Sequence, residues 1–399
     1  MRFFLVVHHD ADLYGADQSL LRTLRAMKQS RFVPIVAVPH MGPLVEILRA
    51  EGFEVHIGPV GKLTRQVMQP TALPALLRDL WRSVKFMTRI VDGRPIALVY
   101  TNSVSALGGA LWAALRRLPR LWHVREIVVA PKVAARGFPL MLQVLGGWCV
   151  CNSNATRQWI VGERTALGPR SSVIWNGLES TTTPTPAAAA RFRQKMGFQP
   201  SDVVVTLVGR INRWKGQGQL IEAAGLLQAQ GQSRLRFLIV GDVADGQHHF
   251  RETMLAQIHA AGLDDIVKWH GFTPEVDVVW AASDIACAPS IDPEPFGRVA
   301  IEAMAQHLPV VAAGHGGLAE IVAHEITGLL VEPGNANALA AAIAKLADAD
   351  PALRQAYGQA GAQRQREHFT QTEHDNKLLA LMQQLADGFK PTALADSPT

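Results

Sequence analysis

The chain has 399 residues, of which 48% are hydrophobic and 18% charged, and its formal net charge is +5. This length and apolar content exclude a mostly disordered protein and leave room for two domains with separate cores. The charge is uneven, because residues 1–178 hold 22 Lys and Arg against 10 Asp and Glu, so the first half is expected to face something anionic. The first apolar run, residues 3–7, is too short for a signal peptide, and a cytoplasmic location is expected.

Short apolar runs alternate with longer amphipathic segments, which is typical of a parallel sheet wound with helices. In the first half the pattern predicts seven strands: 3–7, 33–38, 54–57, 96–100, 120–124, 148–151 and 172–175. Residues 137–156 are uncharged over a membrane-spanning length, but their Pro, Gly and Asn residues predict a helix, a turn and a strand. Cys149 and Cys151 lie far from Cys287, which indicates neither a disulfide framework nor a zinc site and favours a reducing compartment.

A basic stripe is predicted on one helix of the first half, residues 71–91. Its cations recur at spacings of four, three and four, which places them on one face: Arg78, Arg82, Lys85 and Arg89. Trp81 and Phe86 flank the stripe, a composition suited to anionic lipid headgroups. The alternative is a helix face that is only solvated. Nucleic acid is a weak candidate, because no helix-turn-helix or RNA-binding pattern accompanies the charges.

A polar, Pro-containing stretch begins at Glu179 and separates the halves. We therefore expect domains at 1–178 and 179–369, a terminal helix at 370–390 and a disordered tail at 391–399. The second half predicts six strands: 203–208, 236–240, 266–269, 284–289, 309–312 and 328–331.

Polar residues or glycines follow the strands of the second half. Ligands of open parallel sheets bind outside the carboxyl ends of the strands, so these residues form the expected site. In chain order they include Arg210, Lys215, Gly241, Phe272, Glu294, Gly316 and Gly317. Arg210 and Lys215 precede a helix start, and two cations with helix-start amides could hold a diphosphate. Phe272 could border a base, and the amides of the paired glycines could approach a phosphate or sugar.

Two carboxylates, Glu294 and Glu302, are eight positions apart across the start of a helix predicted over 297–306. Ionised carboxylates only accept hydrogen bonds, so they suit the hydroxyls of a polyol. Cations for phosphates and carboxylates for hydroxyls together point to a nucleotide sugar. Considered alone, acidic residues at a helix start would more simply be solvent-exposed.

With these motifs in place, the sequence resembles glycosyltransferase family 4, a group of retaining GT-B enzymes, over nearly its whole length. The matching motifs are VGRINRWKG, VGD, HGF, EPFGRVAIEAMA, GGLAEIV and SVIWNGLE. The resemblance implies an α/β fold of two Rossmann-like, doubly wound parallel-sheet domains facing a cleft. It also implies transfer of a hexosyl group from a nucleoside-diphosphate sugar to a hydroxyl of a glycan or lipid-linked acceptor, as in bacterial surface polysaccharide or lipopolysaccharide synthesis.

The resemblance also implies roles for individual residues. Glu294 would contact the transferred sugar, Glu302 the ribose, and Arg210 with Lys215 the diphosphate. Amides around three consecutive residues would reach the sugar or phosphates: Phe296, Gly297 and Arg298. The further expected donor contacts are Gly241 and Phe272.

The first half matches the family more loosely, at two places. Gly15 lies in the loop after the first strand, where relatives have a glycine-containing loop near the donor phosphate and the acceptor; a helix-entry glycine is the alternative. His123 resembles the family histidine near the donor sugar, and a structural histidine is its alternative. Arg125 could meet acceptor or phosphate charge. The expected catalytic residues are therefore His123, Arg210, Lys215 and Glu294.

Transfer with retention is expected to proceed on the front face of the sugar, without a protein base. Cations at the diphosphate would replace a divalent metal, so neither a metal nor another cofactor is expected. The alternatives are a GT-B-fold sugar-nucleotide epimerase and a non-catalytic nucleotide-sugar-binding subunit. The donor sugar, the base and the acceptor are not specified, and a peripheral contact with an anionic membrane through the basic half remains a hypothesis.

Overall fold

The computed structural model of the protein describes residues 2–13, 15–63, 73–179 and 182–388. The chain forms two compact units. The first comprises the described residues up to Trp175 together with those from Thr372 onward, and the second comprises Asn176–Gln371. The chain changes unit after Trp175, three residues before the boundary placed from the sequence. The tail predicted at 391–399 lies outside the described residues.

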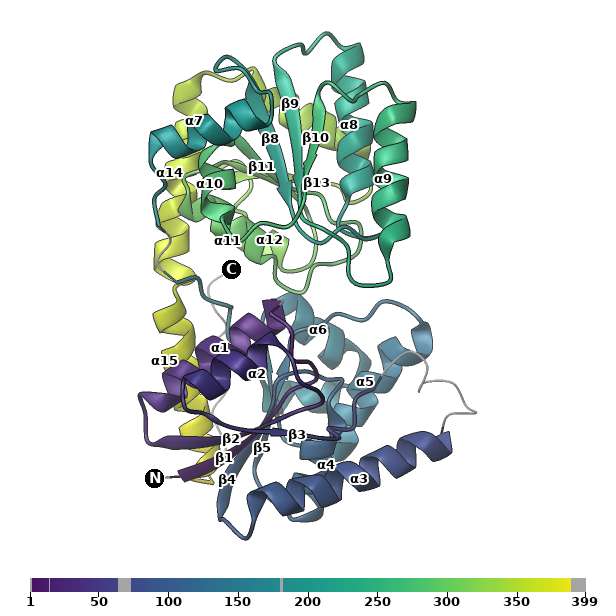
Figure 1. Cartoon of the computed structure of the whole chain (residues 1–399), viewed down its shortest axis with the longest axis vertical. Coiled ribbons are helices and arrows are strands. Elements are labelled where there is room, and N and C mark those ends of the chain that lie inside the picture. Colours follow the sequence, from purple (N-terminus) through teal and green to yellow (C-terminus); the bar gives the residue numbers. More distant parts are fainter. Residues whose placement is uncertain (1, 14, 64–72, 180–181, 389–399) are drawn as a thin grey trace. The chain divides into compact units, whose positions relative to one another are not determined.

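The first unit contains a seven-stranded parallel sheet with the order β3-β2-β1-β4-β5-β6-β7 (Figure 1). Its strands are β1 (Arg2–Val7), β2 (Phe32–Val38), β3 (Glu54–Ile57), β4 (Ile96–Thr101), β5 (Arg120–Val124), β6 (Trp148–Cys151) and β7 (Ser171–Val173). The direction of winding reverses between β1 and β4, so the carboxyl ends of these two strands flank a crevice typical of ligand sites in such sheets.

Helices cover both faces of this sheet. On one face the apolar residues of the strands pack with α1 (Gly15–Lys28), α2 (Pro43–Ala50) and the terminal helix α15 (Gln371–Ala386). On the other face they pack with α3 (Leu73–Val91), α4 (Leu107–Leu115), α5 (Lys132–Leu145) and α6 (Asn154–Glu163). A short 3-10 helix, Thr165–Arg170, precedes β7. The strands are apolar on both sides because both sides are covered.

The second unit contains a six-stranded parallel sheet with the order β10-β9-β8-β11-β12-β13. Its strands are β8 (Val203–Val208), β9 (Leu235–Val240), β10 (Val267–His270), β11 (Ile285–Ala288), β12 (Val310–Ala313) and β13 (Gly328–Val331). Here the winding reverses between β8 and β11. The two loops that the sequence singled out for phosphates and hydroxyls therefore leave neighbouring strands.

Helices of the second unit also lie on both faces. One core joins the sheet to α8 (Gln217–Ala229), α9 (His248–Ala260) and α13 (Ala336–Ala347). A smaller core on the other face includes residues of α7 (Pro186–Lys195) and α10 (Val276–Ala281). The remaining helices are α11 (Arg298–Ala305), α12 (Leu318–Ile321) and α14 (Pro351–His368). The predicted fold class, with two doubly wound parallel sheets, is confirmed.

Candidate active site

The loop after β8 is shaped by side-chain and glycine contacts. The Asn212 side-chain oxygen accepts hydrogen bonds from the amides of Trp214 and Lys215, at 3.0 and 2.9 Å. Gly216 then adopts a φ of +86°, and a Cβ on it would lie 2.1 Å from the carbonyl oxygen of Pro289. Only glycine allows this approach without strain. The loop after β8 is thereby held against the loop after β11.

Lys215 and Glu294, from these two loops, form an ion pair. The distance from Lys215 Nζ to Glu294 Oε1 is 2.6 Å, and the side chains are only 16% and 9% exposed. The second carboxylate oxygen of Glu294 accepts a hydrogen bond from Ser290 Oγ at 2.8 Å. The ammonium also lies 4.7 Å from the centre of the Trp214 ring. Lys215, predicted to bind the diphosphate, and Glu294, predicted to bind the sugar, are thus adjacent.

The loop after β12 completes this edge of the sheet. His315 Nε2 donates to the carbonyl oxygen of Ser290 at 2.9 Å. The amide of Gly317 donates to the carbonyl oxygen of Glu294 at 2.7 Å. A Cβ on Gly316 would lie 2.5 Å from the same Glu294 carbonyl oxygen. The Gly317 amide is thus used within the protein, and this glycine pair serves the close packing of two loops, while the contact of the two amides with a phosphate or sugar stays a prediction.

Two helix starts accompany the ion pair. The helices α13 and α14 begin with side-chain caps, from Asn335 and Asp350. In contrast α8 and α11, which follow Lys215 and Glu294, begin at the left-handed glycines Gly216 and Gly297 and have no side-chain cap. Uncapped helix starts present backbone amides and the positive end of the helix dipole, which suit an anionic ligand.

The other predicted donor contacts occupy varied positions. Glu302 lies 3.7 Å from Arg298 on the same helix, and Arg298 also donates to the Gly177 carbonyl oxygen at 3.1 Å. The Arg210 carbonyl oxygen accepts from Gln217 at 3.0 Å. A Cβ on Gly241 would lie 2.1 Å from the Gly209 carbonyl oxygen, so this glycine lets the ends of β8 and β9 approach each other.

Two aromatic residues of the predicted set differ in exposure. Phe272 is 74% exposed. In the described part of the unit it takes no part in the hydrogen bonds that join Lys215 and Ser290 to Glu294. Phe296 is buried and packs edge-on to Phe369, with ring centres 6.0 Å apart. The side chain of Phe296 therefore anchors the start of α11.

The first unit holds a row of buried polar residues that the sequence analysis did not connect. Val7 pairs with Thr101, and Thr101 pairs with Trp122, so the residues that follow them form a row across β1, β4 and β5. This row consists of His8, Asn102 and His123, all fully buried. The available signal was a polar residue directly after β1 and β4 and a histidine near the end of β5, but strand order was needed to join them.

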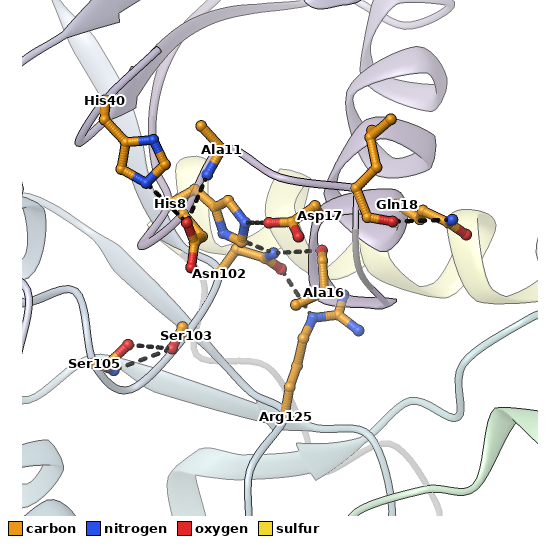
Figure 2. Close-up of polar contacts among 12 residues, drawn as sticks. His8, Ala11, Ala16, Asp17, Gln18, His40, Asn102, Ser103, Ser105 and Arg125 are labelled. Carbon is orange, nitrogen blue, oxygen red and sulfur yellow. Dashed lines mark hydrogen bonds and ion pairs between the residues drawn. The ribbon is translucent and has the colours of Figure 1, made fainter. Parts of the chain in front are cut away.

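Hydrogen bonds connect the row to α1 and to the loop after β5 (Figure 2). His8 Nε2 donates to Asp17 at 2.7 Å, and Asn102 Nδ2 donates to His8 Nδ1 at 3.3 Å. Asn102 Oδ1 accepts from Arg125 Nε at 2.9 Å, as Figure 2 also shows. Each of these side chains is oriented by a neighbour, so the row is a rigid polar platform at the switch point of the sheet.

His123 has a defined tautomer in this network. Arg125 lies 3.1 Å from His123 Nδ1, and a guanidinium can only donate hydrogen bonds. Nδ1 is therefore the acceptor, and the proton of the neutral ring is on Nε2. The Tyr100 hydroxyl lies 2.8 Å from the same Nδ1 and 2.9 Å from Asn102 Oδ1. His123 Nε2 is buried without a hydrogen-bond partner among the described residues, so its proton has no acceptor there.

Burial makes His123 sensitive to acid. Desolvation holds the pKa of His123 well below 6.5, and the nearby charges of Arg125 and His374 act in the same direction. The unfolded chain therefore binds a proton that the folded chain rejects, and stability is full above pH 6.5 and falls below it. We expect the thermal unfolding midpoint to drop between pH 7 and pH 5. A His123→Phe variant should lose less over this range, and equal slopes for the two proteins would contradict the assignment.

Other predicted or charged groups of the first unit lie near this platform. Gly15 begins α1, and a Cβ on it would meet no atom within 4 Å. Asp10 accepts from His40 at 2.9 Å and lies 3.2 Å from Lys62. Among the described residues no group of three or more His, Cys, Asp or Glu could hold a metal ion.

The second unit is similar in sequence to known proteins. Residues 189–364 match the sequence model described as "Glycosyl transferases group 1". The chain is 37% identical over 173 residues to D-inositol 3-phosphate glycosyltransferase of Corynebacterium aurimucosum, covering 43% of this chain and 41% of that protein. It is 35% identical over 170 residues to 2-deoxystreptamine glucosyltransferase of Streptomyces kanamyceticus, covering 42% of each. These matches span well under two thirds of either relative.

Solved structures extend the likeness to the whole fold. The structure of Anabaena Alr3699/HepE in complex with UDP-glucose is similar over 96% of this chain and 100% of that one, with a TM-score of 0.81 and 24% identity. At this identity the likeness concerns the fold, which is the GT-B architecture. Residues 189–364 are thus similar in sequence to group 1 glycosyl transferases, within a chain that has the GT-B fold.

Proposed function

We propose that the protein is a retaining glycosyltransferase of family 4 that moves a hexosyl group from a nucleoside-diphosphate sugar to an acceptor hydroxyl. The observation that carries this proposal is the ion pair of Lys215 with Glu294 beside the uncapped starts of α8 and α11. A cation, a carboxylate and exposed helix amides match the diphosphate and the hydroxyls of one ligand. The HepE complex with UDP-glucose supports a uridine nucleotide as the first donor to test.

Donor binding would rearrange the ion pair. The diphosphate would take hydrogen bonds from Lys215 Nζ, the α8 amides and Arg210, and the sugar hydroxyls would donate to Glu294. The carboxylate that pairs with the ammonium in this structure would then serve as a hydroxyl acceptor. Because both partners are already oriented and mostly buried, little side-chain ordering remains to oppose binding.

The chain's residues would then assist the bond exchange. The acceptor oxygen bonds to the anomeric carbon on the face of the departing diphosphate, the bond from that carbon to the phosphate oxygen breaks, and the acceptor proton passes to the phosphate. Lys215 and Arg210 would stabilise the charge that develops on the diphosphate, and no divalent metal would be needed. The Nε2 proton of His123 would be a hydrogen-bond donor to an oxygen of the sugar or the acceptor.

The acceptor is proposed to be a glycan or a lipid-linked glycan of a bacterial surface polysaccharide. Residues 1–178 carry a net charge of +12, whereas the second half of the chain is net negative. This concentration of positive charge in the first half supports an anionic acceptor or carrier. D-inositol 3-phosphate and 2-deoxystreptamine, after which the two relatives above are named, also present hydroxyls.

Donor binding gives the direct test. We expect one nucleoside diphosphate among UDP, GDP and dTDP, and its sugar, to raise the unfolding midpoint. A ligand at 100 times its dissociation constant should add about 2.7 kcal/mol to stability. No stabilisation by any of them would overturn the proposal. Incubation of the preferred donor with and without acceptors then separates the alternatives: a new donor isomer without acceptor would identify an epimerase, and binding without turnover a non-catalytic subunit.

A further inference from the structure

The helix α3 exposes an apolar row on its outer side. Leu73, Leu77 and Trp81 recur every four residues and are 54%, 58% and 58% exposed. The opposite side of the helix is buried in the core of the first unit through residues that include Phe86 and Ile90. The exposed row therefore takes no part in the packing of this core. In Figure 1, α3 lies at the border of its unit.

Cations border this apolar row. The exposed basic residues of α3 are Arg78, Arg82, Lys85 and Arg89, and its one acidic residue is Asp79. Lys85 Nζ lies 3.6 Å from the centre of the Trp81 ring. This contact places a charge against the ring of an exposed tryptophan. Apolar and cationic side chains thus share one continuous helix surface.

Other exposed apolar and basic residues lie on the helices that follow α3 in the chain. The end of α4 packs beside α3, where Arg116 donates to Thr88 at 2.9 Å, and Leu115 and Arg117 are exposed there. On α5, Val133 and Val144 are 79% and 74% exposed. All three helices cover the same side of the sheet.

We propose that this surface, centred on α3, binds an anionic lipid bilayer. Transfer of leucine and tryptophan side chains from water to the acyl boundary is favourable, and so is the placement of the flanking cations beside anionic headgroups. A nucleic acid backbone would use the cations but would leave the apolar row in water. In the described residues no helix is both long and apolar enough to cross a membrane. The proposed contact is made by a face of the first unit.

Vesicle flotation of the full chain tests the proposal. We expect binding to phosphatidylcholine vesicles that contain phosphatidylglycerol, weaker binding at high salt, and little binding to pure phosphatidylcholine. The quadruple change of Arg78, Arg82, Lys85 and Arg89 to Glu should weaken binding at least about 100-fold. The pair Leu77→Gln and Trp81→Gln should weaken it more than about tenfold. Each side chain is exposed or borders solvent, so the variants should fold, which circular dichroism can check.

A matched control separates local from overall charge. Four exposed cations elsewhere, Arg31, Arg191, Lys195 and Arg366, can be changed to Glu for the same change in net charge. Because charges beyond about 10 Å are screened at 0.1 M salt, this control should bind within about threefold of wild type. Equal binding to neutral and anionic vesicles, no binding to either, or an α3 charge variant that binds like wild type would each overturn the proposal. None of these outcomes depends on the transferase reaction.

Discussion

Replacing Lys215 with alanine is expected to lower kcat/KM for sugar transfer by about 10²–10³-fold, the usual loss when one group that stabilises developing charge is removed. Lys215 is the mostly buried cation at the end of β8 and lies 2.6 Å from Glu294. Added Mg²⁺ should not restore the activity, and chelation of metals should leave the wild type active. Steady-state kinetics with the preferred donor measures both.

Two controls accompany this variant. Arg213 lies in the same loop but pairs with Asp292 and is 58% exposed, so Arg213→Ala should stay within about threefold of wild type. Lys215→Ala also leaves Glu294 without its cation, which lowers stability. The double change Lys215→Met with Glu294→Gln removes that unpaired charge, so it should regain stability while remaining inactive. Wild-type turnover by Lys215→Ala would contradict the proposed role.

Replacing Gly216 with alanine is expected to lower the free energy of unfolding by about 2–5 kcal/mol, combining a left-handed backbone conformation with an overlap in the packed interior. The new Cβ would lie 2.1 Å from the backbone carbonyl oxygen of Pro289, and the two residues belong to the loops that support the site. Relief of this overlap must separate the loops that carry Lys215 and Glu294. Donor affinity should therefore fall together with stability, as measured by denaturant unfolding and ligand titration.

The same helix supplies the matched control. Gly231 follows the end of α8 and has a φ of +81°, close to the +86° of Gly216, but a Cβ on it would meet no atom within 4 Å. Gly231→Ala should therefore show only the backbone cost of about 1–2 kcal/mol and leave donor affinity unchanged. Similar losses at the two positions would show that the approach of the two loops does not matter.

Much of the fold was predictable because it depends on local patterns. Each of the thirteen predicted strands has a counterpart in the structure, with ends that differ by at most two residues, as between the predicted 172–175 and β7 at 171–173. Apolar runs of four to six residues between polar segments leave few alternatives in a chain of this kind. The helix predicted over 71–91 is observed from Leu73, and residues 71–72 lie outside the described ranges.

The candidate site was predictable in part. The proximity of Lys215 and Glu294 follows from a general rule, since the carboxyl ends of parallel strands lie at one edge of the sheet. The role of Gly317 did not follow, because its amide donates to Glu294 across two loops. The same holds for Ser290 and His315, which support the carboxylate through hydrogen bonds whose geometry depends on how three loops pack.

The amino-acid sequence by itself determined the two wound sheets and the residue types at their strand ends, because hydrophobic periodicity and turn chemistry act over a few neighbouring residues. Tertiary structure decided which strand ends are neighbours. The row of His8, Asn102 and His123 exists because β1, β4 and β5 are adjacent, although their residues are far apart along the chain. The tautomer of His123 has the same origin, since hydrogen bonds of specified length and direction form only after the packing of strands has fixed the distances between donors and acceptors.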